Sequence, residues 1–387
     1  MEQRHAGEAG RNSCKWDSSG GHSLRMTELP VRIKDWRARR MTRSLWQRLS
    51  GRTLLARMAL VVLAAFLVPY DIWWRAVAGP YRLDKFRLET YTGCADSDSE
   101  VRLAVVMPLT ARDTERAVEH IRLWTETMAL APCEMKVGEP VQSPTVDLYF
   151  YYDRPLDADE HVRASVQRVR EALQAAPRGP QRCFHTIGFL SAELTADETR
   201  NTYRHNWVTL QVATRGTVTQ FYRLMLDMPH VTEAYTHVFY MEPDARPVRA
   251  HWLAALQRQA DPAVWMKGSP MRYPKPTVLG LEPYRSAYLY HINGNALYRV
   301  GCPCFEAFLR AVRTAYRDYA FDTSIAFYRL EYRHYALFQR TAHRFAYTDV
   351  VADCCDYPLS QCHTDGAYVV HGKHQLASFD WKKLGRY

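Results

Sequence analysis

The chain has 387 residues, of which 47% are hydrophobic and 24% charged, so it has an ordinary globular composition and room for more than one domain. Its net charge is +10, but residues 1–57 hold thirteen Lys and Arg against five Asp and Glu, so the other 330 residues carry only +2. The bulk of the chain lacks the basic field typical of nucleic-acid binding, and we expect no nucleic-acid partner.

An uncharged apolar run, Met58–Tyr70, follows the basic N-terminal residues. Extended to Trp74, it would span roughly 25 Å as a helix, which suits the thinner membranes of the early secretory pathway. The preceding positive charge favours a cytoplasmic N-terminus, and no clear cleavage site follows, so we interpret the run as a retained signal-anchor. The alternative is a buried core helix, which apolar runs of this length often form.

This interpretation divides the chain into four parts. We predict a disordered basic cytoplasmic tail over 1–52, a transmembrane signal-anchor over 53–75, a stem over 76–100 and a lumenal domain over 101–387. The protein would be a single-pass type II protein of the Golgi or ER membrane. Eight cysteines follow the anchor, and an even number in an oxidising lumen predicts up to four disulfides in a pairing left open: Cys94, Cys133, Cys183, Cys302, Cys304, Cys354, Cys355 and Cys362.

From residue 101 onward, short apolar runs typical of buried strands alternate with segments of helical periodicity. We predict strands over 101–107, 146–152, 183–189 and 237–240, and helices around 117–124 and over 159–173, 217–228 and 248–259. This alternation predicts an α/β fold with a mainly parallel sheet flanked by helices. No G-x-G-x-x-G follows the first strand and no Walker loop is present, so a dinucleotide fingerprint and a P-loop are excluded.

Two carboxylates, Glu242 and Asp244, stand directly after the predicted strand 237–240 with Pro243 between them. Ligands of open α/β sheets bind outside the carboxyl ends of the strands. Paired carboxylates at such an end suit a hard cation such as Mn²⁺ or Mg²⁺, which commonly bridges to phosphates. The alternative is a solvated loop that happens to follow a strand.

The stretch Val238-Phe-Tyr-Met-Glu-Pro-Asp244 resembles the D-x-D element of GT-A glycosyltransferases, with Glu in the first position. The order of elements over about residues 100–375 and the anchor, stem and lumenal domain are similar to Golgi enzymes of that fold. The resemblance implies a Rossmann-like GT-A domain. It also implies a metal that bridges the acidic residues to a nucleotide-sugar donor, and transfer of the sugar to a glycan or glycoprotein acceptor.

A second stretch, Tyr368-Val-Val-His371-Gly-Lys373, is similar to a C-terminal GT-A element that supplies a third metal ligand. The resemblance assigns His371 to the metal, together with Glu242 and Asp244, and Lys373 to the donor phosphates. The alternative is a surface histidine in a chain that has fifteen.

Asn293-Gly294-Asn295 is predicted to form a tight turn. Asn side chains supply the paired donors and acceptors that sugar hydroxyls need, and GT-A proteins often line the donor-sugar pocket with a segment at this distance from the acidic triplet. We therefore assign all three residues to substrate binding. The alternative is a plain hairpin turn.

The other assigned residues are placed by position along the chain. Arg215, at the start of the helix before the acidic strand, is assigned to the diphosphate, because Arg pairs bidentately with phosphate. Pro108, which ends the predicted strand 101–107, and Lys267, at a strand end that faces the same cleft, are also assigned to donor or substrate binding. Asp322 is the candidate base that an inverting enzyme needs, with a helix N-cap as its alternative role.

These patterns predict a metal-dependent glycosyltransferase. The alternative is a membrane-anchored, catalytically silent glycan-binding protein on the same fold, which would need no metal. A metal-dependent phosphohydrolase usually needs more Asp and His ligands than these segments offer.

Overall fold

The computed structural model describes residues 100–134, 145–176, 182–199, 204–206, 211–213, 215–270, 291–317, 319–330, 335–354 and 365–372. All of them belong to one unit of the chain, Phe86–Tyr387. The predicted cytoplasmic tail and signal-anchor, and Lys373, lie outside these ranges. Among the residues within them, no helix has the length and apolar character needed to cross a membrane.

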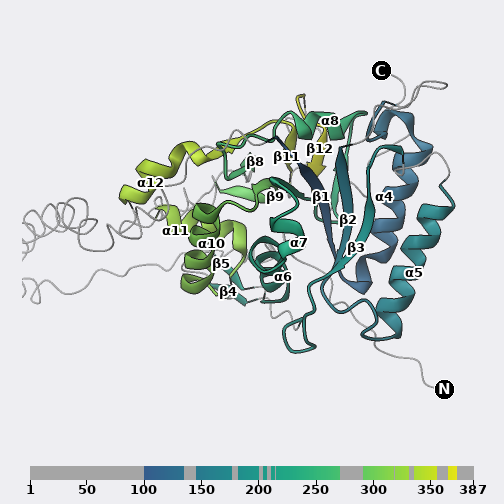
Figure 1. Ribbon diagram of the computed structural model, residues 1–387, viewed down its shortest axis with the longest axis horizontal. Coiled ribbons are helices and arrows are strands. Elements are labelled where there is room, and N and C mark those ends of the chain that lie inside the picture. Colours follow the sequence, from purple (N-terminus) through teal and green to yellow (C-terminus); the bar gives the residue numbers. More distant parts are fainter. Residues whose placement is uncertain are drawn as a thin grey trace, which may run out of the picture. The chain divides into compact units, whose positions relative to one another are not determined.

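A seven-stranded mixed sheet forms the centre of this unit (Figure 1), in the order β10-β8-β9-β6-β1-β2-β3. The strands are β1 Leu103–Leu109, β2 Val146–Tyr152, β3 Ile187–Ser191, β6 His237–Tyr240, β8 Met266–Pro270, β9 Ile292–Arg299 and β10 Phe345–Tyr347. Strand β9 runs antiparallel to both neighbours, whereas all other neighbouring pairs are parallel. The predicted α/β fold with a mainly parallel sheet is confirmed.

Helices cover both faces of this sheet (Figure 1). One face packs against α4 (Thr114–Glu126), α5 (Glu160–Gln174) and α8 (Trp252–Gln257). The other packs against α6 (Arg215–Leu226), α10 (Pro303–Ala315) and α11 (Phe321–Leu330). Alternate residues of β1 enter the two cores, with Val105 in the first and Val106 in the second. Burial on both faces explains why this strand is an unbroken apolar run.

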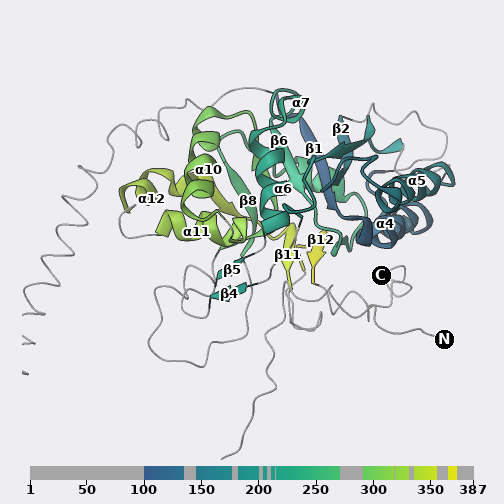
Figure 2. The same ribbon diagram turned by 90° about the horizontal axis from the view of Figure 1, so that it is seen from below.

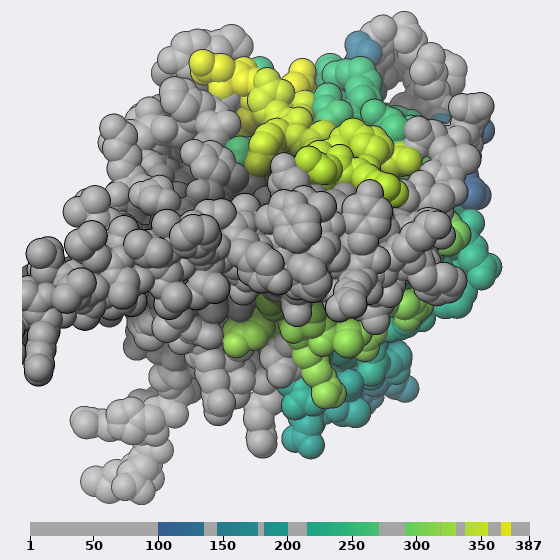
Figure 3. Space-filling model, turned by 90° about the vertical axis from the view of Figure 1, so that its left-hand side faces the viewer, coloured from purple at the N-terminus to yellow at the C-terminus, as the bar shows by residue number. Residues whose placement is uncertain are grey.

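The helices have the spacing expected from the sequence. In α4 the predicted inward residues Ala117, Ile121 and Trp124 are all buried. In α5 the side chain of Asp159 caps the helix by accepting a hydrogen bond from the Val162 N–H at 3.0 Å. Two further helices are short, α7 (Pro229–Thr232) and α12 (Tyr335–Thr341). Part of the segment 337–354 reaches the surface, where Figure 3 shows it in yellow-green.

Three predicted boundaries are wrong. Pro108 lies inside β1 instead of ending it, because the pairing of β1 with β6 stops at Val106 and the missing N–H of Pro108 is not needed there. The strand predicted over 183–189 begins later, at Ile187, since Cys183 is bonded to Cys133 and packs in the core. The helix predicted over 248–259 is shorter, Trp252–Gln257.

A small three-stranded sheet, absent from the sequence prediction, consists of β11 (Val351–Asp353), β12 (Val369–His371) and β7 (Ala245–Pro247). Strand β12 pairs in parallel with β11 and antiparallel with β7. In Figure 2, β11 and β12 lie side by side next to the main sheet. Strand β4 (Arg204–Asn206) pairs antiparallel with β5 (Gln211–Ala213) in a separate two-stranded sheet. Because β7 directly follows Asp244, the small sheet brings the C-terminal strand to the acidic pair.

Cysteine pairing agrees in part with the sequence expectation. Cys133 and Cys183 form a disulfide, and Cys304 and Cys354 each take part in a disulfide. Among the described residues, Cys302 is a free thiol.

Candidate metal centre

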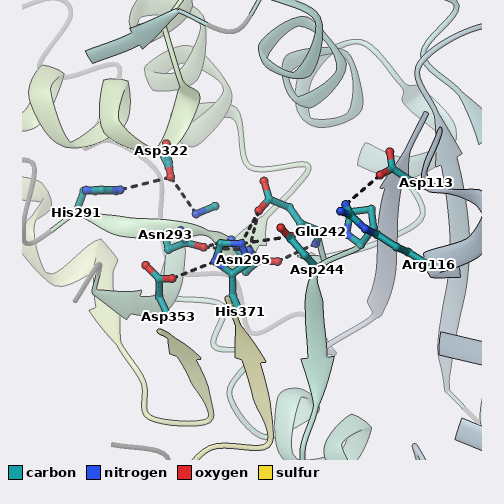
Figure 4. Close-up of polar contacts among 12 residues, drawn as sticks. Asp113, Arg116, Glu242, Asp244, His291, Asn293, Asn295, Asp322, Asp353 and His371 are labelled. Carbon is teal, nitrogen blue, oxygen red and sulfur yellow. Dashed lines mark hydrogen bonds and ion pairs between the residues drawn. The ribbon is translucent and has the colours of Figure 1, made fainter. Parts of the chain in front are cut away.

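Three potential metal ligands from distant parts of the chain converge at the carboxyl end of β6 (Figure 4). Glu242 and Asp244 follow β6, and His371 ends β12, whose register sets His371 opposite Ala245. The Nε2 atom of His371 lies 3.3 Å from Asp244 Oδ1 and 3.4 Å from Glu242 Oε2. One potential ligand atom from each residue lies within 4.8 Å of the others.

The residues fit a divalent cation. The His371 side chain is 3% exposed, and its Nε2 makes no hydrogen bond although two carboxylates face it. Its other nitrogen, Nδ1, lies 3.0 Å from Asp353 Oδ1. A buried imidazole nitrogen that faces two carboxylate oxygens, once it has lost its proton, completes a ligand set that Mn²⁺ accepts, and oxygen ligands also suit Mg²⁺.

Burial and crowding perturb the charges of this cluster. Burial raises the pKa of Glu242 to about 7, with His371 opposing this shift and the charges of Asp244 and Asp322 adding to it. Burial also disfavours the charged form of His371, but the carboxylates of Asp244 and Asp353 outweigh it and hold the pKa of this imidazole well above its usual range. Protons therefore balance the negative charge of the cluster, and a dication can take their place.

Asn295 holds Glu242 at two points (Figure 4). Its Nδ2 donates to Glu242 Oε2 at 2.9 Å, and its Oδ1 accepts from the Glu242 N–H at 2.8 Å. The amide of Asn295 is oriented in turn by Asn293, whose Oδ1 accepts from the Asn295 side chain and from its backbone N–H, both at 3.0 Å. The orientation of the Glu242 carboxylate is therefore set by β9.

The predicted turn at Asn293-Gly294-Asn295 is wrong, because all three residues lie inside the buried strand β9. Strand pairing is possible because the Asn side chains satisfy one another and Glu242. Gly294 permits a close approach: a Cβ there would lie 2.9 Å from Phe321 Cζ and 3.7 Å from Glu242 Oε1. Glycine therefore lets α11 pack directly beside the acidic residue.

Asp322 lies in the first turn of α11 and near Glu242. It accepts hydrogen bonds from the backbone N–H groups of Gly294 at 3.2 Å and Thr323 at 2.7 Å, and His291 Nε2 lies 3.4 Å away. Burial favours the neutral acid, but these donors hold the pKa of the carboxyl below its usual range. A general base benefits from a raised pKa, so this arrangement is better suited to orienting β9.

Helix α4 holds the acidic turn from its other side. The buried His120 ring has Nε2 3.1 Å from the carbonyl oxygen of Pro243, the residue between the two carboxylates. On the same helix, Glu119 accepts a hydrogen bond from Arg246 of β7 at 2.6 Å. The turn from Glu242 to β7 is therefore fixed by α4 as well as by β9.

The other assigned residues are not brought into contact with the cluster. Arg215 is exposed at the start of α6, where its charge acts on Glu198. Lys267 is half-buried in β8, and Pro108 is buried in β1. Their roles stay predictions. The sequence reading missed Asp353 and His120, although Asp353 ends the short apolar run Val350-Val-Ala-Asp353 just as Glu242 follows one.

The chain matches no protein-family model and no curated protein sequence. Its structure is similar, at low identity, to solved glycosyltransferase structures that include the following three. For apo mouse xyloside xylosyltransferase 1, the match has 10% identity, covers 71% of this chain and 99% of that one, and has a TM-score of 0.39. For the galactosyltransferase LgtC with donor and acceptor sugar analogues, the identity is 10%, the match covers 73% of this chain and 94% of that one, and the TM-score is 0.39. For core-mannan synthase A of Aspergillus fumigatus in its Mn/GDP form, the identity is 10%, the match covers 67% of this chain and 76% of that one, and the TM-score is 0.31.

Proposed function

We propose that this protein is a GT-A glycosyltransferase that moves a sugar from a nucleotide-sugar donor to a glycan or glycoprotein acceptor. The observation that supports this is the convergence of Glu242, Asp244 and His371 at the carboxyl end of β6. Ligand sites of α/β sheets occupy this position, and the ligand set suits a cation that also binds phosphate oxygens. A glycan-binding protein without turnover has no need of such a cluster, so that alternative is not favoured.

In this proposal Glu242, Asp244 and His371 hold Mn²⁺ or Mg²⁺, which when bound would neutralise charge developing on the leaving nucleoside diphosphate. Asn295 is almost fully buried and contacts Glu242, so we assign it to orienting that carboxylate. We assign Gly294, which lies beside Glu242, and its neighbour Asn293 to the sugar-binding side. We assign Asp322 to orienting β9, because it accepts a hydrogen bond from the Gly294 N–H.

The test is a screen of donor hydrolysis and transfer by the purified full-length chain across common UDP- and GDP-sugars, with Mn²⁺, with Mg²⁺ and with EDTA. We expect turnover of one donor that EDTA abolishes and that Asp244→Ala lowers by about 100-fold or more. Asp147→Ala, at the amino end of β2 and away from the cluster, is the control for loss of an acidic side chain. Unchanged turnover in Asp244→Ala would refute the metal role.

We also propose that the catalytic unit lies in the lumen of the Golgi or ER, anchored by the segment 53–75. The Cys133–Cys183 disulfide supports an oxidising compartment. Protease treatment of intact microsomes should leave residues 101–387 protected until detergent is added. Digestion of this part in intact vesicles would contradict the predicted topology.

A further inference from the structure

We propose that Asp353 is a positioning residue of the metal centre, which holds His371 so that Nε2 faces Glu242 and Asp244 and thereby favours Mn²⁺ over Mg²⁺. This inference rests on the metal role proposed above. Asp353 is itself no ligand in this arrangement, because its carboxylate lies on the far side of the imidazole ring.

The contact fixes which nitrogen of His371 is available. Asp353 Oδ1 lies 3.0 Å from His371 Nδ1, and both residues are almost fully buried. A carboxylate accepts and cannot donate, so the proton of the ring must sit on Nδ1. When the imidazole is neutral, its lone pair is therefore on Nε2, the atom 3.3 Å from Asp244 Oδ1 and 3.4 Å from Glu242 Oε2.

The backbone holds Asp353 in place without any metal. The parallel register of β11 and β12 sets Asp353 directly opposite His371. The Asp353 N–H donates to Ser269 Oγ of β8 at 3.0 Å, and the next N–H, of Cys354, donates to the His371 carbonyl at 2.8 Å. The Asp353–His371 pair is therefore attached to β8 of the main sheet and oriented before a cation binds.

A second Asp–His contact in the protein shows what a structural pair looks like. Asp147 Oδ1 lies 3.2 Å from His185 Nδ1 at the amino end of β2, where the His185 side chain is 68% exposed. Asp147 also accepts hydrogen bonds from Tyr235 and from the Thr186 N–H. Water can reach the second nitrogen of His185, whereas that of His371 is buried against two carboxylates. The His371 pair therefore differs from a surface pair in that its second nitrogen faces two further carboxylates.

The charge of Asp353 also affects which cation is preferred. A carboxylate that accepts a hydrogen bond from Nδ1–H makes the lone pair on Nε2 more basic and so a stronger metal ligand. Removing such a partner typically lowers metal affinity 10- to 100-fold. Mn²⁺ gains from an imidazole ligand, whereas Mg²⁺ is held mainly by oxygen ligands and water. Loss of Asp353 should therefore weaken Mn²⁺ binding more than Mg²⁺ binding.

The test is titration calorimetry of the full-length chain with MnCl₂ and with MgCl₂. We expect Asp353→Asn to raise the Kd for Mn²⁺ about 10- to 100-fold and the Kd for Mg²⁺ by less than about fivefold. Asp147→Asn, the control in the other Asp–His pair, should leave both unchanged. In a His371→Ala background, Asp353→Asn should cause no further loss.

Two results would overturn the inference: wild-type affinity for Mn²⁺ in Asp353→Asn, or equal losses for Mn²⁺ and Mg²⁺. Failure of the wild-type chain to bind Mn²⁺, with or without a nucleotide, would instead refute the proposed metal function. If Asp353→Asn does not fold, histidine-selective ¹⁵N NMR of the wild-type chain with Zn²⁺ addresses the same point. We expect His371, identified by its absence in His371→Ala, to keep its proton on Nδ1, and a proton on Nε2 would overturn the inference.

Discussion

Asn295→Asp is the sharpest test of how the fold sets up Glu242. The substitution keeps the size of the side chain but replaces the Nδ2 donor, 2.9 Å from Glu242 Oε2, with a carboxylate oxygen. Two carboxylate oxygens at this separation must either repel each other as anions or share a proton. In both cases Glu242 stops being a freely available anionic ligand.

The expected size of the effect follows from the lost contact. A hydrogen bond to a charged group contributes about 1.5–3 kcal/mol, and 1.4 kcal/mol corresponds to a tenfold change in affinity. We therefore expect the Kd for Mn²⁺ to rise about 10- to 100-fold at pH 7.5. The substitution also removes the donor to the buried Asn293 Oδ1, 3.0 Å away, so the melting temperature of the metal-free chain should fall while the shape of the side chain is kept.

The assay is titration calorimetry with MnCl₂ next to a thermal melt. Thr236→Val is the matched control at the other end of β6, where the Thr236 hydroxyl accepts from the Arg102 N–H at 2.9 Å and donates to the Arg102 carbonyl at 3.1 Å. It should lower stability by about 1–2 kcal/mol and leave the Kd for Mn²⁺ unchanged. Wild-type Mn²⁺ affinity in Asn295→Asp, or an equal loss in the control, would refute the reasoning.

Three further predictions concern pH, the acidic turn and the disulfide. Because the pKa of Glu242 is raised to about 7, its proton stabilises the metal-free fold at low pH, and this contribution is lost as pH rises through 7. Mn²⁺ competes with that proton, so it should raise the melting temperature more at pH 8 than at pH 6. A shift in melting temperature that does not depend on pH would contradict this. His120→Gln, which keeps a donor for the Pro243 carbonyl, should retain Mn²⁺ affinity in calorimetry, whereas His120→Leu should lose about tenfold; equal affinities would exclude the contact as a determinant. Replacing both cysteines of Cys133–Cys183, 50 residues apart, by Ser should lower the unfolding free energy by about 4 kcal/mol in denaturant titrations, and an unchanged midpoint would count against this.

The elements that could be predicted from the sequence are those whose side chains carry a periodic signal. The strand 146–152 has the predicted bounds because it is buried on one face throughout, and α5 follows because Val162, Val166 and Val169 repeat at helical spacing. The acidic pair could be proposed as a ligand site because it directly follows a buried strand.

The small sheet could not be predicted in the same way. Its strands β7, β11 and β12 have three residues each, too few for periodicity to show. Their pairing depends on contacts between segments far apart in the chain. The turn predicted at Asn293-Gly294-Asn295 was wrong for a different reason. Tertiary hydrogen bonds with Glu242 and the packing of Phe321 outweigh the local turn propensity of these residues.

The pairing of β7 with β12 has a consequence for the order in which the protein is assembled. Glu242 and His371 can meet only when a long loop closes, and this closure costs chain entropy before the contacts of β12 can form. A chain with its main sheet formed but β12 undocked would have a core yet no complete site. Only chains with β12 docked would then bind the cation. Free Mn²⁺ would therefore shift the equilibrium toward the fully folded state by mass action.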